Sequence, residues 1–272
     1  MTTPEHYDEL GVTFKTNAKV TAIDKETKIV TTESGENYHY DELVLATGSY
    51  PFVPPIPGKD QPHCLVYRTI DDLEDIASSA KVSKVGVVIG GGLLGLEAAN
   101  AIKQLGLETH VVEFAPQLMG VQIDGGGGRL LREKIEDLGV QVHTSKATNV
   151  IEKGDICRYK LCFNDGSELE TDLILFSAGI RPYDNLAREF DLTVGERGGI
   201  VVNNQCQTSN QNIYAIGECA LWNNFIFGLV APGYSMAKVA AKHISGAPDE
   251  KGNTAEFTGA DMSTKLKLMG VE

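Results

Sequence analysis

The chain has 272 residues, of which 42% are hydrophobic and 22% charged, and this composition is typical of a globular protein. Its 37 acidic residues outnumber 24 lysines and arginines, and the formal net charge of −13 argues against binding to a nucleic-acid backbone. The start of the chain has no apolar signal-peptide core, and the most apolar run, 85–96, is too short to cross a bilayer. The five cysteines do not form a secreted disulfide pattern, so we expect a cytoplasmic protein without membrane partners.

In chain order, the first patterned region runs from 19 to 51. Short apolar and β-branched runs alternate there with a glycine-containing turn, which predicts a β-meander. The apolar run 43–45 predicts a buried strand, and Gly48 follows it closely.

The next region, 84–113, predicts a strand, a glycine turn, a helix and a second strand. Gly90, Gly92 and Gly95 form a G-x-G-x-x-G motif directly after the first strand, which is the place that a dinucleotide-binding βαβ unit requires. Gly90 allows the tight turn, Gly92 lets the backbone approach a pyrophosphate, and Gly95 lets the helix pack close to the strand. The helix start, including Gly91, Leu93 and Leu94, is expected to face the phosphates with free N–H groups.

Two acidic residues are candidates for cofactor contacts. Glu113 ends the second strand, near the position where an acid binds the adenosine ribose hydroxyls. A carboxylate there favours NADH over NADPH, because a 2′-phosphate would meet a like charge. Glu97 follows Gly95 by two residues and either stabilises the helix start electrostatically or points into the cofactor cleft.

Four consecutive glycines, Gly125–Gly128, precede a predicted helix over 129–138. Glycine weakens a helix, so we expect these four residues to form a flexible loop.

The region that ends at Pro182 repeats the plan of the first meander. When Gly35 is aligned with Gly166, Gly48 falls on Gly179 and Pro51 falls on Pro182. The second copy is preceded by the βαβ unit at 84–113, whereas only ten residues precede Gly11 in the first copy. We therefore expect the first copy to lack its own dinucleotide fingerprint and the chain to be truncated at its start.

Four motifs carry a resemblance to a known family: ATG at 46–48, GGGLLGLEAA at 90–99, SAGIRP at 177–182 and IYAIGECA at 213–220. Together they resemble the two-dinucleotide flavoprotein reductases of the pyridine nucleotide-disulfide oxidoreductase family. The resemblance implies an α/β fold in which a Rossmann-like NAD-binding domain is inserted in an FAD-binding domain that is incomplete here. The implied bounds are 1–66 and 183–249 for the FAD-binding domain, 67–182 for the NAD-binding domain, and 250–272 for a linker to a further domain.

The resemblance also implies cofactor-binding residues and cofactors. Thr47 and Gly48, with the repeat counterpart Gly179, correspond to cofactor-binding loops, and Gly217 and Glu218 correspond to a Gly-Asp pair that contacts the flavin. The cofactors implied are FAD and NADH, with NADPH disfavoured. No catalytic side chain and no metal ligand are identified.

The function implied is transfer of electrons from NADH through flavin to metal centres, siroheme and iron–sulfur clusters, outside this chain. A small partner subunit and a homodimer are further expectations. The alternatives are a stand-alone NADH:rubredoxin or ferredoxin reductase and a non-catalytic NAD-binding fragment.

Overall fold

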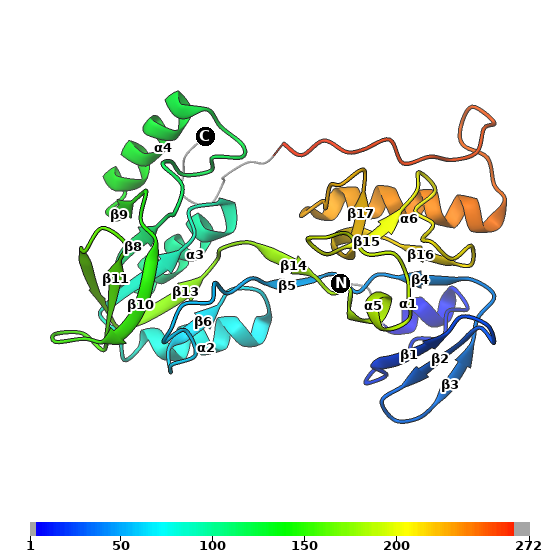
Figure 1. The fold of residues 1–272 in the computed structure, drawn as a ribbon, viewed down its shortest axis with the longest axis horizontal. Helices are drawn as coiled ribbons and strands as arrows, with labels where there is room; N and C mark the ends of the chain where they lie inside the picture. Colours follow the sequence, from blue (N-terminus) through cyan, green and yellow to red (C-terminus); the bar gives the residue numbers. More distant parts are fainter. Residues whose placement is uncertain (1–3, 264–272) are drawn as a thin grey trace. The chain divides into compact units, whose positions relative to one another are not determined.

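The computed structural model describes residues 4–263. The contacts divide the chain into two compact units, which we call the inserted unit, residues 49–181, and the discontinuous unit, residues up to 48 with residues 182–261 (Figure 1). The family resemblance implies an inserted domain at 67–182. The compact unit begins earlier because β5 (Ser49–Pro51) pairs with β14 (Ile180–Pro182).

A five-stranded sheet forms the centre of the inserted unit, and all its neighbouring strands are parallel. In spatial order the strands are β6 (Cys64–Val66), β13 (Leu173–Phe176), β7 (Val85–Ile89), β8 (Glu108–Val112) and β9 (Val140–His143). The helices are α2 (Ile70–Ala80), α3 (Leu93–Gln104) and α4 (Gly125–Asp137). Because β7 and β8 are parallel, the glycine turn and Glu113 follow their carboxyl ends at the same edge of the sheet, where doubly wound folds bind ligands.

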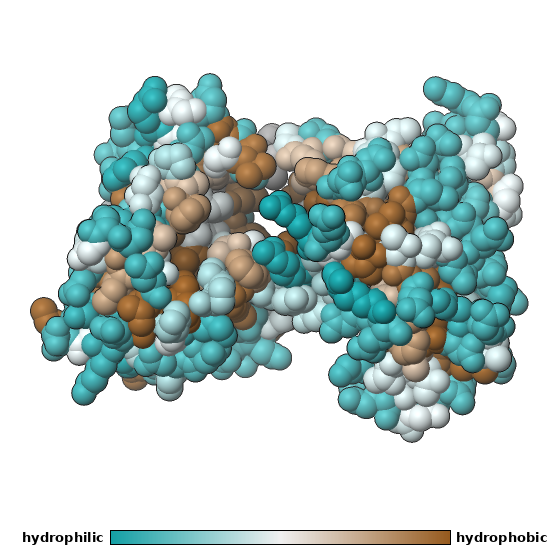
Figure 2. Space-filling view, in the orientation of Figure 1, coloured by the Kyte–Doolittle hydropathy of each residue, from teal (hydrophilic) through white to brown (hydrophobic). Residues whose placement is uncertain are grey.

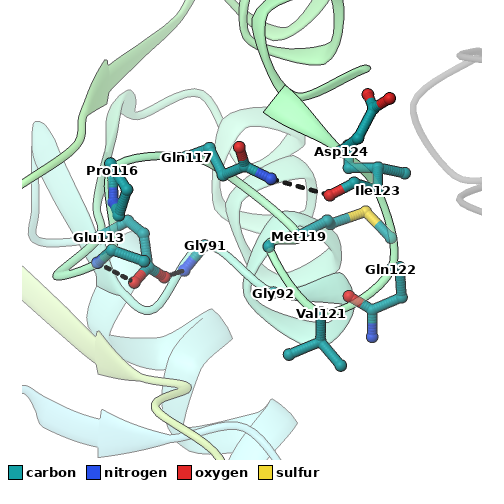
Figure 3. A pocket seen from close by; sticks show the side chains of 12 residues that line it. Gly91, Gly92, Glu113, Pro116, Gln117, Met119, Val121, Gln122, Ile123 and Asp124 are labelled. Atoms are coloured by element: carbon teal, nitrogen blue, oxygen red, sulfur yellow. Dashed lines mark hydrogen bonds between the residues drawn. The ribbon is translucent and has the colours of Figure 1, made fainter. Parts of the chain in front are cut away.

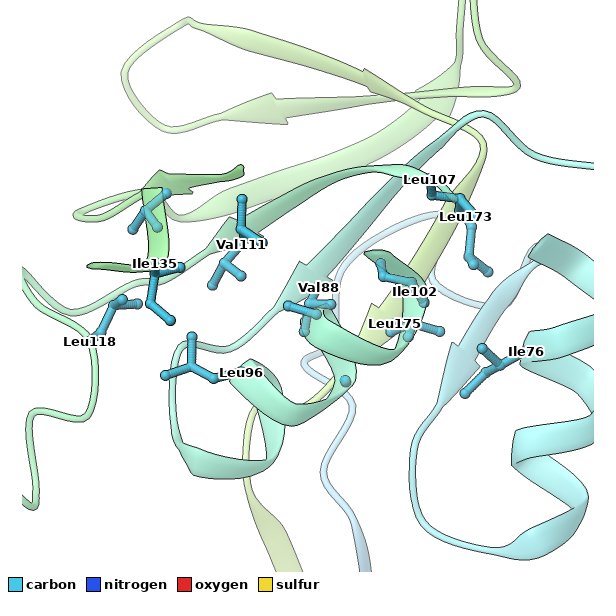
Figure 4. Close-up of a cluster of buried hydrophobic side chains, with 14 of the residues drawn as sticks. Ile76, Val88, Leu96, Ile102, Leu107, Val111, Leu118, Ile135, Leu173 and Leu175 are labelled. Atoms are coloured by element: carbon cyan, nitrogen blue, oxygen red, sulfur yellow. The ribbon is translucent and has the colours of Figure 1, made fainter. Parts of the chain in front are cut away.

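The core lies on both faces of this sheet, because successive strand residues point to opposite faces. Val88 and Leu175 pack with Leu96 and Ile102 of α3 on the helical face (Figure 4). Val87 and its neighbours on the other face pack against a β-meander. Burial on both faces explains why β7 is an almost uninterrupted apolar run.

Two three-stranded antiparallel sheets confirm the internal repeat. The first consists of β1 (Val20–Asp24), β2 (Ile29–Thr32) and β3 (Asn37–His39), and the second of β10 (Thr148–Lys153), β11 (Tyr159–Phe163) and β12 (Glu168–Thr171). Gly35 and its counterpart Gly166 both have positive φ, 84° and 81°. The same chain path therefore occurs in both units.

The discontinuous unit also contains elements outside its three-stranded sheet. They are α1 (Pro4–Glu9), β4 (Leu43–Leu45), α5 (Asn185–Glu189), β15 (Ile200–Val202), β16 (Ile213–Ala215), the 3₁₀ turn η1 (Gly217–Cys219), β17 (Ala220–Trp222) and α6 (Val230–Ser245). β4 pairs with β16, and β15 pairs with β17, both in parallel. Val44 is 40% exposed, whereas its repeat counterpart Leu175 is fully buried, and apolar patches interrupt the polar surface of this unit in Figure 2.

The segment after α6 differs from the expected linker. Phe257 is only 2% exposed and packs edge-on against Trp222 and Phe227. Its N–H donates to the carbonyl oxygen of Asn204 at 2.7 Å. Burial of this aromatic side chain attaches the segment to the discontinuous unit as far as residue 261, and residues 264–272 lie outside the described residues.

The predicted loop at Gly125–Gly128 is wrong, because these glycines form the first turn of α4. Asp124 caps the helix, and its Oδ1 accepts the N–H of Gly127 at 2.8 Å. Gly128 is buried against the side chain of Gln117. A cap and tertiary packing outweigh the weak helix propensity of glycine.

Candidate functional site

The glycine turn between β7 and α3 has the geometry that its spacing predicts. Gly90 has a φ of 124°, which L side chains rarely adopt, and a Cβ there would lie 2.2 Å from the carbonyl oxygen of Ser177. A Cβ on Gly95 would lie 1.9 Å from the carbonyl oxygen of Gly90. A Cβ on Gly92 would meet no atom within 4 Å. The first and third glycines are thus required by the protein itself, whereas the second faces open space.

The start of α3 suits an anion. Gly92 is the N-cap residue and makes no side-chain cap hydrogen bond, so the first N–H groups of the helix have no capping side chain. The helix dipole places partial positive charge at the same point. Leu93 packs against the core, and Leu94 is 43% exposed beside it.

Glu113 lies directly after β8, next to the glycine turn. Its Oε2 accepts the N–H of Gly91 at 2.5 Å, and its Oε1 accepts the N–H of Ala115 at 2.7 Å. The residue is half-buried, so the carboxylate is held in place but remains accessible from the hollow that it lines.

A hollow of about 680 Å³ opens over the glycine turn (Figure 3). Gly91, Gly92 and Glu113 form one side, and residues of the β8–α4 loop between Ala115 and Asp124 form the rest. The lining includes two carboxylates and neither lysine nor arginine. No sequence motif marks this loop, although the segment that follows the second strand of a βαβ unit begins at the ligand-binding edge of the sheet.

Glu97 lies on α3 but is not among the residues that line this hollow. It falls beyond the first turn of the helix, which contains no acid, so the expected stabilisation of the helix start is not its role. Burial raises the pKa of Glu97, and Glu97 together with burial raises the pKa of Tyr67. The charge of Glu97 is therefore felt at Tyr67, in the segment that leads into α2.

The remaining predicted residues separate into two groups. Gly179 belongs to the inserted unit, has a φ of 106°, and accepts the N–H of Phe52 at its carbonyl oxygen. Thr47, Gly48, Gly217 and Glu218 belong to the discontinuous unit.

In the discontinuous unit, the hydroxyl of Thr47 donates to the carbonyl oxygen of Tyr183 at 2.6 Å. Gly48 and Gly217 have positive φ, 70° and 72°, and a Cβ on either would meet no atom within 4 Å. Glu218 lies in η1, against which α6 packs. The open space beside Gly48 and Gly217 would allow a ligand to approach the backbone closely.

The described residues contain no group of three or more His, Cys, Asp or Glu side chains that could hold a metal ion. All five cysteines are free thiols. Burial raises the pKa of Cys64 to about 11 and that of Cys206 to about 12, so both stay protonated. Within the same described range, no helix is long and apolar enough to span a membrane.

Curated relatives match almost the whole chain. The nitrite reductase [NAD(P)H] large subunit of Klebsiella oxytoca is 58% identical over 98% of this chain, and the nitrite reductase (NADH) large subunit of Escherichia coli is 54% identical over 98%. The chain spans only 27% and 31% of those two proteins. The rubredoxin-NAD(+) reductase of Pseudomonas putida is 31% identical, and the chain covers 70% of it.

Solved structures agree with this fold. A ferredoxin reductase from Rhodopseudomonas palustris superimposes with a TM-score of 0.84 at 26% identity, over 90% of this chain and 61% of that one. A water-forming NADH oxidase from Lactobacillus brevis bound to NADH superimposes with a TM-score of 0.82 at 25% identity, over 90% of this chain and 56% of that one. The family model for pyridine nucleotide-disulphide oxidoreductases matches residues 2–243. The chain therefore belongs to the pyridine nucleotide-disulphide oxidoreductase family.

Proposed function

We propose that this chain is the NADH-oxidising flavoprotein module of a nitrite reductase large subunit. The observation that carries the proposal is the hollow at the carboxyl edge of the inserted sheet, where an uncapped helix start, the open Gly92 and the carboxylate of Glu113 converge. The identity of 58% to a nitrite reductase large subunit supports nitrite as the substrate of the whole protein.

In this proposal the pyrophosphate of NADH lies at the start of α3, and Glu113 accepts hydrogen bonds from the adenosine ribose hydroxyls. Carboxylates line the hollow without any lysine or arginine, and this charge disfavours the 2′-phosphate of NADPH. The roles of Gly90 and Gly95 are to fix the turn and the close packing of α3.

The residues of the discontinuous unit fit part of a flavin site. Gly48 and Gly217 have open space where a Cβ would stand, and Thr47 and Glu218 flank them. These four residues would contact FAD, which when bound accepts hydride from NADH and delivers electrons to metal centres one at a time. The described residues include a single βαβ unit with a glycine turn, so we expect weak retention of FAD by this chain alone.

The proposal assigns siroheme and iron–sulfur clusters to parts of the longer protein beyond this chain. A small-subunit partner and a homodimer stay predictions. We also propose a cytoplasmic location, because five free thiols suit a reducing compartment.

Calorimetric titration tests the nicotinamide part of the proposal. We expect NADH to bind more tightly than NADPH, and Glu113→Ala to narrow that difference by about 1–3 kcal/mol, the range for a lost hydrogen bond to a charged group. Equal affinities of the unmodified chain for the two nucleotides would show that this assignment of Glu113 is wrong.

The flavin part has its own test. Flavin content after gel filtration and NADH-dependent ferricyanide reduction measure whether this chain alone works as a reductase. We expect little flavin and slow turnover. A fully flavinated monomer with rapid turnover would contradict the expectation that this chain alone forms only part of a flavin site.

A second candidate is a stand-alone rubredoxin or ferredoxin reductase, because the chain covers 70% of the Pseudomonas putida relative. Adding rubredoxin to the flavin-loaded chain separates the two candidates. Rapid NADH-dependent reduction of rubredoxin would favour this second candidate.

A further inference from the structure

The Glu113 carboxylate, proposed above to bind a ribose, also accepts two main-chain hydrogen bonds. Gly91 donates its N–H to Oε2 of Glu113 at 2.5 Å (Figure 3). Ala115 donates its N–H to Oε1 of Glu113 at 2.7 Å. Both oxygens of Glu113 therefore hold main-chain groups before any ligand binds. Ribose hydroxyls would use the lone pairs that remain, since a carboxylate offers about four acceptor positions.

The middle residue of the glycine turn is held from both sides. The carbonyl oxygen of Gly91 accepts the N–H of Met119 at 2.9 Å, while its N–H is bonded to Glu113. A Cβ on Gly91 would lie 2.5 Å from the Leu118 side chain. The loop after β8 thus fixes the orientation of this peptide.

Glu113 is itself attached to the sheet. Its N–H donates to the carbonyl oxygen of His143 at 2.8 Å, and its carbonyl oxygen accepts the N–H of Lys146 at 3.0 Å. The carboxylate consequently extends from a rigid support. Through the Gly91 bond, the end of β8 sets the position of the turn between β7 and α3.

We propose that Glu113 is a positioning residue for the pyrophosphate, in addition to its ribose contact. By accepting the Gly91 N–H, Glu113 holds the turn so that Gly92 and the first N–H groups of α3 face the phosphates. The inference rests on the proposed binding of NADH to this hollow. A turn that is ordered in advance removes part of the entropy cost of binding.

The two roles of Glu113 separate when the ligand lacks the ribose hydroxyls. We would titrate the chain and Glu113→Ala with NADH and with an NADH analogue whose adenosine ribose carries neither hydroxyl. A positioning role predicts that Glu113→Ala binds the analogue roughly tenfold more weakly, as expected for the loss of a hydrogen bond to a charged group. Equal affinity of both proteins for the analogue would overturn the proposal.

Asp124 offers a matched control, because it is the other carboxylate that lines the hollow. Its side chain bonds to Gly127 and not to the glycine turn. Asp124→Asn removes the second negative charge of the hollow and keeps an N-cap residue, so the affinity for the analogue should fall by much less than in Glu113→Ala. A loss equal to that of Glu113→Ala would assign the effect to charge in the hollow and overturn the positioning role.

Hydrogen exchange at the Gly91 amide tests the same contact without a ligand. We expect exchange about tenfold faster in Glu113→Ala. An intermediate rate is expected in Glu113→Gln, because its single amide oxygen can replace only one of the two carboxylate oxygens that accept the N–H groups of Gly91 and Ala115. Unchanged exchange in the alanine variant would overturn the proposal. If the unmodified chain binds no NADH, the proposed function fails, and the exchange rates still decide whether Glu113 holds the turn.

Discussion

Two helices of the inserted unit begin in glycine-rich sequence, and the comparison shows that the glycines serve different purposes. Before α3, Gly90 needs its φ of 124°, and Gly95 leaves no room for a Cβ. At the start of α4, none of the glycines Gly125–Gly128 has positive φ. A Cβ on Gly125 would be 3.6 Å from its nearest neighbour, an ordinary contact.

The two helix starts also differ in how their N–H groups are satisfied. Asp124 caps α4 with a carboxylate, which satisfies a donor and adds negative charge. Gly92 caps α3 without a side-chain bond, which leaves donors free for a ligand. A run of glycines alone therefore does not indicate a phosphate site, whereas positive φ, close packing and an uncapped helix start together do.

The substitution with the largest expected effect is Gly95→Ala. Its Cβ would overlap the carbonyl oxygen of Gly90 at 1.9 Å, so the strand and helix must separate. Overpacking of this kind costs about 3 kcal/mol of unfolding free energy. Thermal or urea unfolding measures the loss, and an unchanged midpoint would show that α3 can move away from β7 at no cost.

Gly92→Val should separate binding from stability. The new side chain enters open space with extended backbone (φ −81°, ψ −176°), so the unfolding free energy should fall by less than about 1 kcal/mol, mostly from a poorer N-cap. The side chain fills the space assigned to the pyrophosphate, and titration should detect no NADH binding. NADH binding by the Gly92→Val variant would show that the glycine motif only forms a structural turn.

Acid should weaken the edge of the inserted sheet where β8 pairs with β9. Nδ1 of His110 in β8 lies 3.1 Å from Nε2 of His143 in β9, and burial lowers the pKa of both rings. The charges of His110, Lys146 and Arg132 lower the pKa of His143 further, and Glu136 raises it. Glu108 raises the pKa of His110.

The sign of the pH dependence follows from these lowered pKa values. The folded state disfavours the charged form of both rings, whereas an unfolded histidine titrates at about 6.5. The contribution of this pair to the unfolding free energy should thus have its full value above that pH and should decline as the pH falls below it. Urea unfolding between about pH 8 and 5 measures the decline, and His143→Gln should flatten it. An identical slope in that variant would exclude the pair as the cause.

Gly125→Ala should have the smallest effect, and it should be stabilising. The backbone at Gly125 is helical and an alanine side chain fits, so the gain is about 0.5 kcal/mol, chiefly from a less flexible unfolded chain. Gly90→Ala is the matched control, because the same change at a φ of 124° should destabilise. A loss of stability in Gly125→Ala would mean that the start of α4 also depends on glycine.

The sequence predicts the region around α3 well because the same glycines are required by the backbone geometry and by the proposed ligand. The spacing of Gly90, Gly92 and Gly95 requires one backbone path, and the apolar run before it can only be a buried strand. The internal repeat predicts the two meanders for the same reason, since Gly35 and Gly166 need positive φ.

Other parts depend on tertiary contacts that spacing does not reveal. The turn Gly125–Gly128 is helical because of the Asp124 cap and the packing of Gly128 on Gln117. Phe257 is buried by aromatic side chains that lie far from it in sequence. The loop that completes the hollow has no motif of its own, and its place follows only from the fold.

The pairing of β5 with β14 has a practical consequence. The chain enters and leaves the inserted unit at neighbouring positions, where Phe52 donates its N–H to the carbonyl oxygen of Gly179 at 2.9 Å. A segment whose two ends meet can be spliced into a host loop or joined by a short linker, because closing it costs little entropy. Residues 49–181 are in this sense a transferable cassette that carries the glycine turn, Glu113 and the hollow together.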